Sequence, residues 1–157
     1  MKKKRVVIIS LLLLLVSVIG ISSYFLFKDK INPLDVDPSA VEWNGKKQKD
    51  TSGEENTIAI PGFEKVTLYA NETTQAVNFH NPEINDCYFK ISLIHPDGSV
   101  LWISDLIEPG KGMYSIELEK TLAVGEYENA VLKYECFSLN DQSPLNGSEI
   151  NLKLVVV

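Results

Sequence analysis

Few side chains in this sequence have the types and spacing that chemistry needs. The chain of 157 residues has two histidines, His80 and His95, and neither has an acidic or thiol residue at a characteristic spacing. A zinc site or a base-activated nucleophile requires several such groups to converge on one point. Three glutamates, Glu126, Glu128 and Glu135, stand at positions expected to face solvent, not in a tight calcium loop. The sequence therefore predicts a protein that is not an enzyme and that binds no metal or cofactor.

The two cysteines, Cys87 and Cys136, are the remaining reactive groups. Two cysteines outside the cell permit one disulfide. One bridge cannot replace an apolar core, so the fold must depend mainly on buried apolar side chains.

The elements that position these residues are short strands. From residue 57 onward, apolar and polar residues alternate in runs separated by turn signals, of which Pro96, Asp97 and Gly98 form the strongest. Alternation with a period of two buries one face of each strand, and two antiparallel sheets packed face to face bury all of these faces. We expect an all-β antiparallel sandwich of seven to eight strands over residues 57–157. The alternating runs are 65–69, 75–79, 87–94, 100–103, 114–118, 127–137 and 150–156.

Leu122, Gly125 and Tyr127 stand at the entrance to the longest of these runs. This arrangement resembles the tyrosine corner of immunoglobulin-like and fibronectin-type sandwiches. The resemblance covers residues 57–157 and implies that the Tyr127 hydroxyl bonds the backbone a few residues upstream. The alternative is an ordinary glycine turn before a strand. Many unrelated functions share this fold, so the resemblance concerns architecture alone.

The same resemblance implies that the strands of Cys87 and Cys136 are antiparallel neighbours, with both thiols on the apolar face. The start of one strand would then face the end of the other. Two alternatives stay open, because disulfide geometry between neighbouring strands is demanding. One is a disulfide between Cys87 and Cys136, and the other is a buried reduced pair.

The N-terminal region reads as a membrane anchor. Three lysines and Arg5 precede an apolar run over residues 6–27, which is long enough to span a bilayer as a helix. Cations on one side of a span keep that side in the cytoplasm. We expect residues 1–5 to be a cytoplasmic stub, residues 6–27 a single-pass signal-anchor helix, and the rest to lie outside the cell. The alternative is cleavage as a signal peptide after about residue 20.

Residues 28–56 are polar and rich in turn formers, which predicts a flexible tether before the extracellular domain at 57–157. Within the tether, residues 40–43 are more apolar, and either an isolated patch or a short strand packed on the domain explains them. Residues 31–157 hold nine Lys and Arg against 20 Asp and Glu, a net charge of −11. This acidity excludes nucleic acid as a partner.

The lysine- and asparagine-rich, single-anchor plan is similar to that of small surface proteins of Gram-positive bacteria. We expect a membrane-anchored extracellular protein-interaction module, an accessory part of a bacterial envelope, adhesion or secretion assembly, with a protein partner in the envelope. The candidate partner contacts are Trp102, Pro109 and Lys111, and Val155 and Val157 at the tip of the last strand. Core packing is the alternative for Trp102, and cover by the tether or a loop is the alternative for the tip.

A second function of another class stays open. The turn at Asp97 and Gly98, Trp102, and the later loop at Pro109 and Gly110 loosely resemble bacterial intracellular proteinase inhibitors. The resemblance implies a protease-inhibitor-like sandwich that inserts an extended loop into a protease groove. The predicted membrane segment weighs against an intracellular inhibitor.

Overall fold

The computed structural model describes residues 33–45 and 57–157. The predicted stub, the predicted span and part of the predicted tether lie outside these residues. The chain divides into two compact units, Met1–Pro33 and Leu34–Val157, and only the second is described below. Among the described residues, no helix has the length and apolar character needed to cross a membrane.

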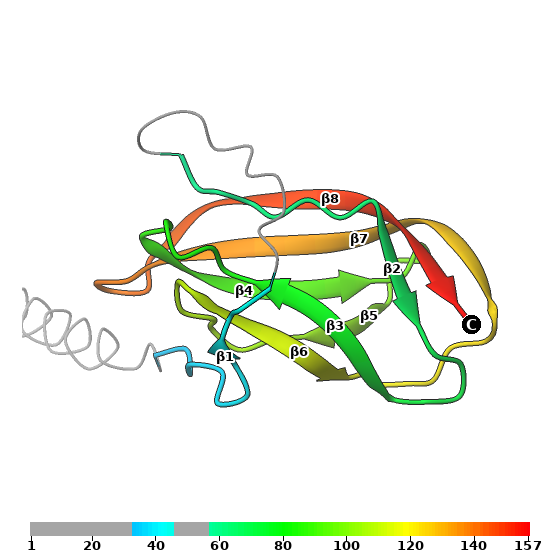
Figure 1. The fold of residues 1–157 in the computed structure, drawn as a ribbon. Coiled ribbons are helices and arrows are strands. Elements are labelled where there is room, and N and C mark those ends of the chain that lie inside the picture. The colour runs from blue at the N-terminus through cyan, green and yellow to red at the C-terminus, as the bar shows by residue number, and fades with distance from the viewer. Residues whose placement is uncertain (1–32, 46–56) are drawn as a thin grey trace, which may run out of the picture. The chain divides into compact units, whose positions relative to one another are not determined.

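The unit Leu34–Val157 is built from strands alone in its described part, which confirms the predicted all-β class (Figure 1). The element pattern follows the predicted runs closely from residue 65 onward, and one further strand precedes them. The strands are β1 (Val41–Glu42), β2 (Lys65–Leu68), β3 (Thr74–His80), β4 (Cys87–Ile94), β5 (Val100–Ile103), β6 (Lys111–Glu117), β7 (Gly125–Ser138) and β8 (Pro144–Val156).

The strands form two sheets, of order β1-β6-β3 and β2-β8-β7-β4-β5 (Figure 1). All pairs are antiparallel except β2 and β8, which run parallel from Lys65 beside Lys153 to Leu68 beside Val156. This pair corrects the predicted purely antiparallel sandwich. Alternation within a strand shows which face is buried, but it does not show which strand lies alongside.

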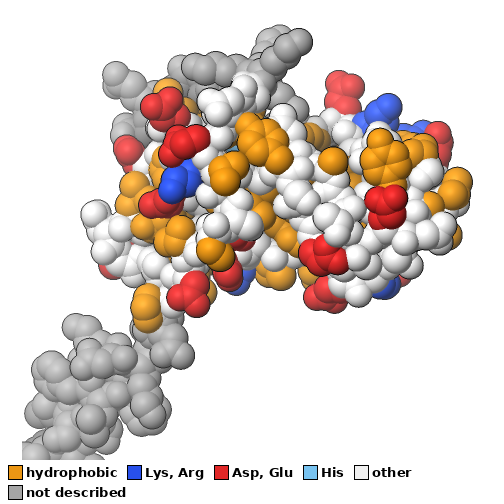
Figure 2. Space-filling model, turned by 60° about the horizontal axis from the view of Figure 1, so that its bottom comes forward, with side chains coloured by type: hydrophobic (Ala, Val, Ile, Leu, Met, Phe, Trp, Pro, Cys, Tyr) orange, Lys and Arg blue, Asp and Glu red, His pale blue; other side chains and the backbone are white. Residues whose placement is uncertain are grey.

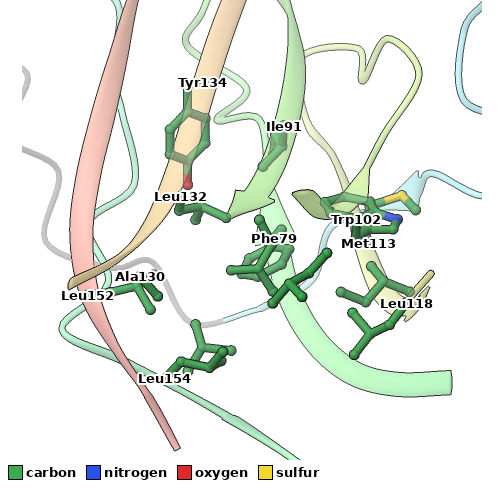
Figure 3. Packing of buried hydrophobic residues seen from close by; sticks show 14 of the residues in the cluster. Phe79, Ile91, Trp102, Met113, Leu118, Ala130, Leu132, Tyr134, Leu152 and Leu154 are labelled. Carbon is green, nitrogen blue, oxygen red and sulfur yellow. The ribbon is translucent and has the colours of Figure 1, made fainter. Parts of the chain in front are cut away.

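Alternating side chains from both sheets fill the space between them (Figure 3). The Phe79 ring on β3 lies 5.8 Å from the Trp102 ring on β5, so the two sheets meet through aromatic contacts. Within the larger sheet, Phe89 and Tyr134 meet edge to face at 5.3 Å. Each fully buried side chain of this size contributes about 1.5–3 kcal/mol to folding. Burial of these side chains therefore stabilises the packing of the two sheets.

Two buried asparagines fasten the loops at one end of the domain. Asn81 donates from Nδ2 to the carbonyls of Cys87 and Ile107, at 2.8 and 2.9 Å. Asn85 accepts the Ala59 N–H at 2.8 Å and donates to the Ala59 carbonyl at 3.0 Å. A buried polar group without a partner costs free energy, so these matched bonds hold the segment before β2 against the core.

Residues 34–45, which the sequence analysis assigns to the flexible tether, are part of the domain, and we call them the strap. β1 lies within the strap and pairs with the start of β6, and Val36 forms a parallel bridge with Leu106. The structure thus corrects the predicted tether at these residues and contains the short strand named as the alternative at 40–43. Polar composition predicts a coil. The strap is instead held by backbone hydrogen bonds, which residue composition does not reveal.

Candidate interaction surfaces

An apolar patch lies where β2, β8 and β7 come together at one end of the five-stranded sheet. The last register row of these strands is flanked by Tyr69, Val157 and Val124. Their exposed fractions are 54%, 55% and 72%. Each of the three lies one residue beyond this paired row, at the same end of the sheet. We call these three exposed side chains the end patch (Tyr69, Val124 and Val157).

Backbone pairing continues through the end patch and covers the edge of β8. The Val157 N–H donates to the Leu68 carbonyl at 3.0 Å, and the Ala70 N–H donates to the Val157 carbonyl at 2.8 Å. Val156 is buried in the core and Val155 is half-buried. The predicted free strand tip is therefore corrected, because β2 occupies the edge of β8. Of the two predicted contacts there, only Val157 is well exposed.

Trp102 is buried, so the structure corrects its prediction as a partner contact and contains the core packing named as its alternative (Figure 3). The neighbouring Leu101 is buried as well, although strict alternation would expose one of the two. The reason is a register shift in the pairing of β4 with β5, between Leu93 and Ile94. The exposed side chains of β5 are Val100 and Ile103 instead.

The loop with the predicted contacts Pro109 and Lys111 is fastened to the strap. Gly110 adopts a φ of 78°, and its carbonyl accepts the Trp43 N–H at 2.9 Å. The Lys111 ammonium pairs with the Glu108 carboxylate at 2.7 Å. Pro109 and Lys111 are both half-buried. The backbone of this loop is thus already engaged within the domain.

Trp43 occupies a seat built by β3 and β6, which the sequence analysis missed. Its ring stacks on the His80 ring with 3.7 Å between centroids and 9° between planes. Its Nε1 donates to Asn78 Oδ1 at 2.7 Å. A Cβ at Gly112 would lie 2.8 Å from the Trp43 ring, so only glycine leaves room there. The one signal in the sequence was a tryptophan inside an otherwise polar segment.

His80 lies buried beneath that ring, and its Nδ1 has no hydrogen-bond partner among the described residues. Desolvation lowers the pKa of His80, and a hydrogen bond with the backbone of Asn78 offsets only part of that effect. Burial penalises the charged form of an imidazole. His80 is therefore a neutral platform for Trp43 at pH 7.

His95 has an acidic partner, which corrects the expectation that neither histidine has one. Its Nδ1 lies 3.0 Å from Asp97 Oδ1 in the turn between β4 and β5. Hydrogen bonds from Ser99, and a further one from His95, hold the pKa of Asp97 well below its usual range. The Gly98 N–H closes the turn on the His95 carbonyl at 2.8 Å. The carboxylate is therefore engaged in holding the turn together.

Tyr127 lies at the start of β7 and reaches back to the preceding loop. Its hydroxyl donates to the Ala123 carbonyl at 2.9 Å, four residues upstream. A Cβ at Gly125 would stand 3.5 Å from the ring, so the ring lies over this glycine. Leu122 is buried, and its carbonyl accepts the Asn71 N–H at 3.5 Å. These contacts join the β2–β3 turn, the loop before β7 and β7 itself.

Cys87 and Cys136 are buried and are free thiols in the structure. In the register of β4 and β7, Cys87 stands beside Ser138 and Cys136 beside Phe89, so the two cysteines are diagonal neighbours. A hydrogen bond with Cys87, together with burial, raises the pKa of the Cys136 thiol. The structure thus contains the reduced pair, the second of the two alternatives.

Acidic side chains are spread over the visible surface instead of gathering at one point (Figure 2). Lys153 pairs with Glu126 and Glu128 at 2.6 and 3.0 Å, and Glu126 borders the end patch. Within residues 33–45 and 57–157, no group of three or more His, Cys, Asp or Glu side chains could hold a metal ion. Comparisons of the chain with protein-family models, curated proteins and solved structures found no match.

Proposed function

We propose that this chain is a membrane-anchored extracellular protein-interaction module, an accessory part of a bacterial envelope, adhesion or secretion assembly. The observation that carries the proposal is the end patch. Exposed apolar side chains gathered on one surface are typical of protein contacts. Charged groups at the border, such as Glu126 and Lys153, match the polar rim that surrounds the apolar centre of such contacts.

The position of the end patch within the domain supports this function. The N–H and carbonyl of Leu34 bind the side chain of Gln142, at 2.7 and 3.0 Å, beyond the far end of β7. β7 has 14 residues and so extends over about 45 Å from there toward the end patch (Figure 1). The chain enters the domain at one end and the patch lies at the other.

The immunoglobulin-like architecture is part of the same proposal. It is supported by the contact of the Phe79 and Trp102 rings from different sheets and by the Tyr127 hydroxyl bond to Ala123. Domains of this architecture expose loops and sheet ends at both extremities. The end patch is such an extremity, formed by the chain next to β2, β7 and β8.

A matched set of variants tests the proposed function in intact cells. The full chain, a Val124→Ser, Val157→Ser double variant and an Ile84→Ser variant are each crosslinked to their neighbours and purified. Ile84 is 70% exposed and lies before β4, near the opposite end of the domain. We expect the double variant to lose the captured partner and Ile84→Ser to retain it. Capture that is unchanged in the double variant would exclude the end patch as the contact.

The protease-inhibitor-like alternative has no specific observation in its favour. An inhibitory loop of the predicted kind is extended and free to enter a protease groove. The turn at Asp97 is closed by the Gly98 N–H, and the loop at Gly110 is bonded to Trp43. Both segments that carried the resemblance are thus engaged within the domain.

A further inference from the structure

We propose that the strap exchanges between two copies of this chain, so that residues 34–45 of one copy dock on β6 of a second copy. The seat that β6 offers is filled within one chain by the strap itself. The inference concerns a surface other than the end patch, and it rests on the proposed function only for the membrane anchor that concentrates the copies.

Much of the hold on the strap comes from hydrogen bonds, and its two valines bury little apolar surface. Val36 and Val41 remain 42% and 49% exposed while docked. The Asp37 carboxylate accepts the Asp105 N–H at 3.1 Å, and the Asn44 N–H donates to the Tyr114 hydroxyl at 2.8 Å. Water replaces such bonds when the strap leaves, so each one adds little to the net free energy of docking.

The seat is nevertheless built for this particular sequence. An incoming strand must supply an aromatic ring with an N–H at the position of Trp43, because His80 provides a flat platform and Asn78 an acceptor. It must also pass close to the backbone at Gly112, where no Cβ fits. At the far end of the strap, the Gln142 side chain accepts the Leu34 N–H and donates to the Leu34 carbonyl. The strap of a second, identical chain meets all of these requirements.

The covalent connection allows the exchange. Eleven residues, 46–56, join the strap to the rest of the domain. At full extension they reach about 40 Å, so a strap can leave its own domain and still belong to the chain. Exchange conserves every contact within the seat. The equilibrium between the monomer and the exchanged dimer then depends on the concentration of the chain. Two chains anchored in one membrane would have a high effective concentration.

Single cysteines on the two partner strands distinguish exchange from docking within one chain. Glu42 stands beside Lys111 in the β1–β6 register, and neither side chain is buried. One copy of the full chain carries Glu42→Cys and a second, differently tagged copy carries Lys111→Cys. Both are expressed together in one membrane and oxidised, and the covalent product is separated by mass. The native cysteines are buried, and the wild-type chain controls for them.

We expect a covalent dimer that contains both tags and that requires both cysteines. Glu42→Cys combined with Glu117→Cys is the register control, because Glu117 is exposed at the other end of β6 and pairs with Thr74. This pair should give no dimer, and adding Trp43→Ala to the Glu42→Cys copy should remove most of the dimer band. The proposal is overturned if the mixture gives no dimer while Glu42→Cys and Lys111→Cys within one chain close completely. The proposal is also overturned if no disulfide forms either in the mixture or in the chain that carries both cysteines, because the β1–β6 register would then be wrong.

Discussion

At the scale of single residues, Tyr127 joins a loop to a strand through one hydrogen bond. Its hydroxyl donates to the Ala123 carbonyl, and its ring lies 5.0 Å from the His95 ring. The bond is exposed to solvent, so water can satisfy the carbonyl when the hydroxyl is removed. The contribution of this residue should therefore be modest but measurable.

We expect Tyr127→Phe to lower the free energy of unfolding by about 0.5–1 kcal/mol. Urea denaturation followed by circular dichroism measures the change. Tyr69→Phe is the matched control, because the Tyr69 side chain is exposed and has no hydrogen bond to the part of the chain that the structure describes. Equal stability of Tyr127→Phe and wild type would show that the bond to Ala123 contributes nothing.

His80 should make the stability depend on pH. Burial lowers its folded-state pKa below the ordinary value of 6.5. Between those two values the unfolded chain binds more protons than the folded chain. The contribution of neutral His80 to the free energy of unfolding is therefore complete above about pH 6.5. It is lost as the pH falls toward the folded-state pKa. We expect the free energy of unfolding to decrease from pH 7.5 to pH 5.5.

His80→Phe provides the comparison for this pH dependence. Phenylalanine keeps an aromatic platform under Trp43 but has no titrating group. The variant should lose most of the decrease that the wild type shows between pH 7.5 and pH 5.5. A decrease of equal size in both proteins would assign the pH dependence to other groups.

Single residues also show where sequence reasoning ended. Val157 was predicted as a contact and is exposed, whereas Tyr69 and Val124, next to the paired ends of β2 and β7, were not predicted. Their proximity depends on the parallel pairing of β2 with β8. That pairing joins residues far apart in the chain, and no local pattern encodes it. For Trp102 the sequence left partner contact and core packing both open, because a register shift and not alternation decides which face it occupies.

At the scale of elements, alternation predicted strands well and their partners poorly. The runs 87–94 and 100–103 coincide with β4 and β5, and 127–137 lies inside β7. These strands cover a core on one face, so their sequences alternate between apolar and polar side chains. The sequence of the strap lacks this alternation, because the strap is held by the backbone of β6 and by Gln142. Composition alone therefore assigned it to a tether.

Gly112 is the residue on which docking of the strap depends most. A Cβ there would lie 2.7 Å from the Phe79 carbonyl oxygen and 2.8 Å from the Trp43 ring. We expect Gly112→Ala to displace the strap and to lower the free energy of unfolding by about 1–3 kcal/mol. Denaturant unfolding gives the free energy, and Trp43 fluorescence reports whether its ring has become exposed.

The control for this variant is Gly62→Ala, because a Cβ at Gly62 would meet nothing within 4 Å. It should change the free energy of unfolding by less than about 0.5 kcal/mol. A Gly112→Ala protein as stable as the Gly62→Ala protein would contradict the seat described for Trp43.

At the scale of the whole molecule, acidic side chains are dispersed over the visible surface with exposed apolar side chains among them (Figure 2). A net charge of −11 over residues 31–157 keeps such a domain soluble and repels other acidic surfaces. Specific contact must then come from shape and apolar area. The end patch offers exposed apolar side chains, and the chain enters the domain at the far end.

Site-specific photo-crosslinking in living cells tests the proposed interaction most directly. A photoreactive amino acid replaces Val124 in one version of the full chain and Ile84 in another. The two positions are almost equally exposed, at 72% and 70%, but lie near opposite ends of the domain. We expect position 124 to crosslink to a discrete protein partner and position 84 to give none. Equal crosslinking from both positions, or a partner captured only from position 84, would contradict the proposed role of the end patch.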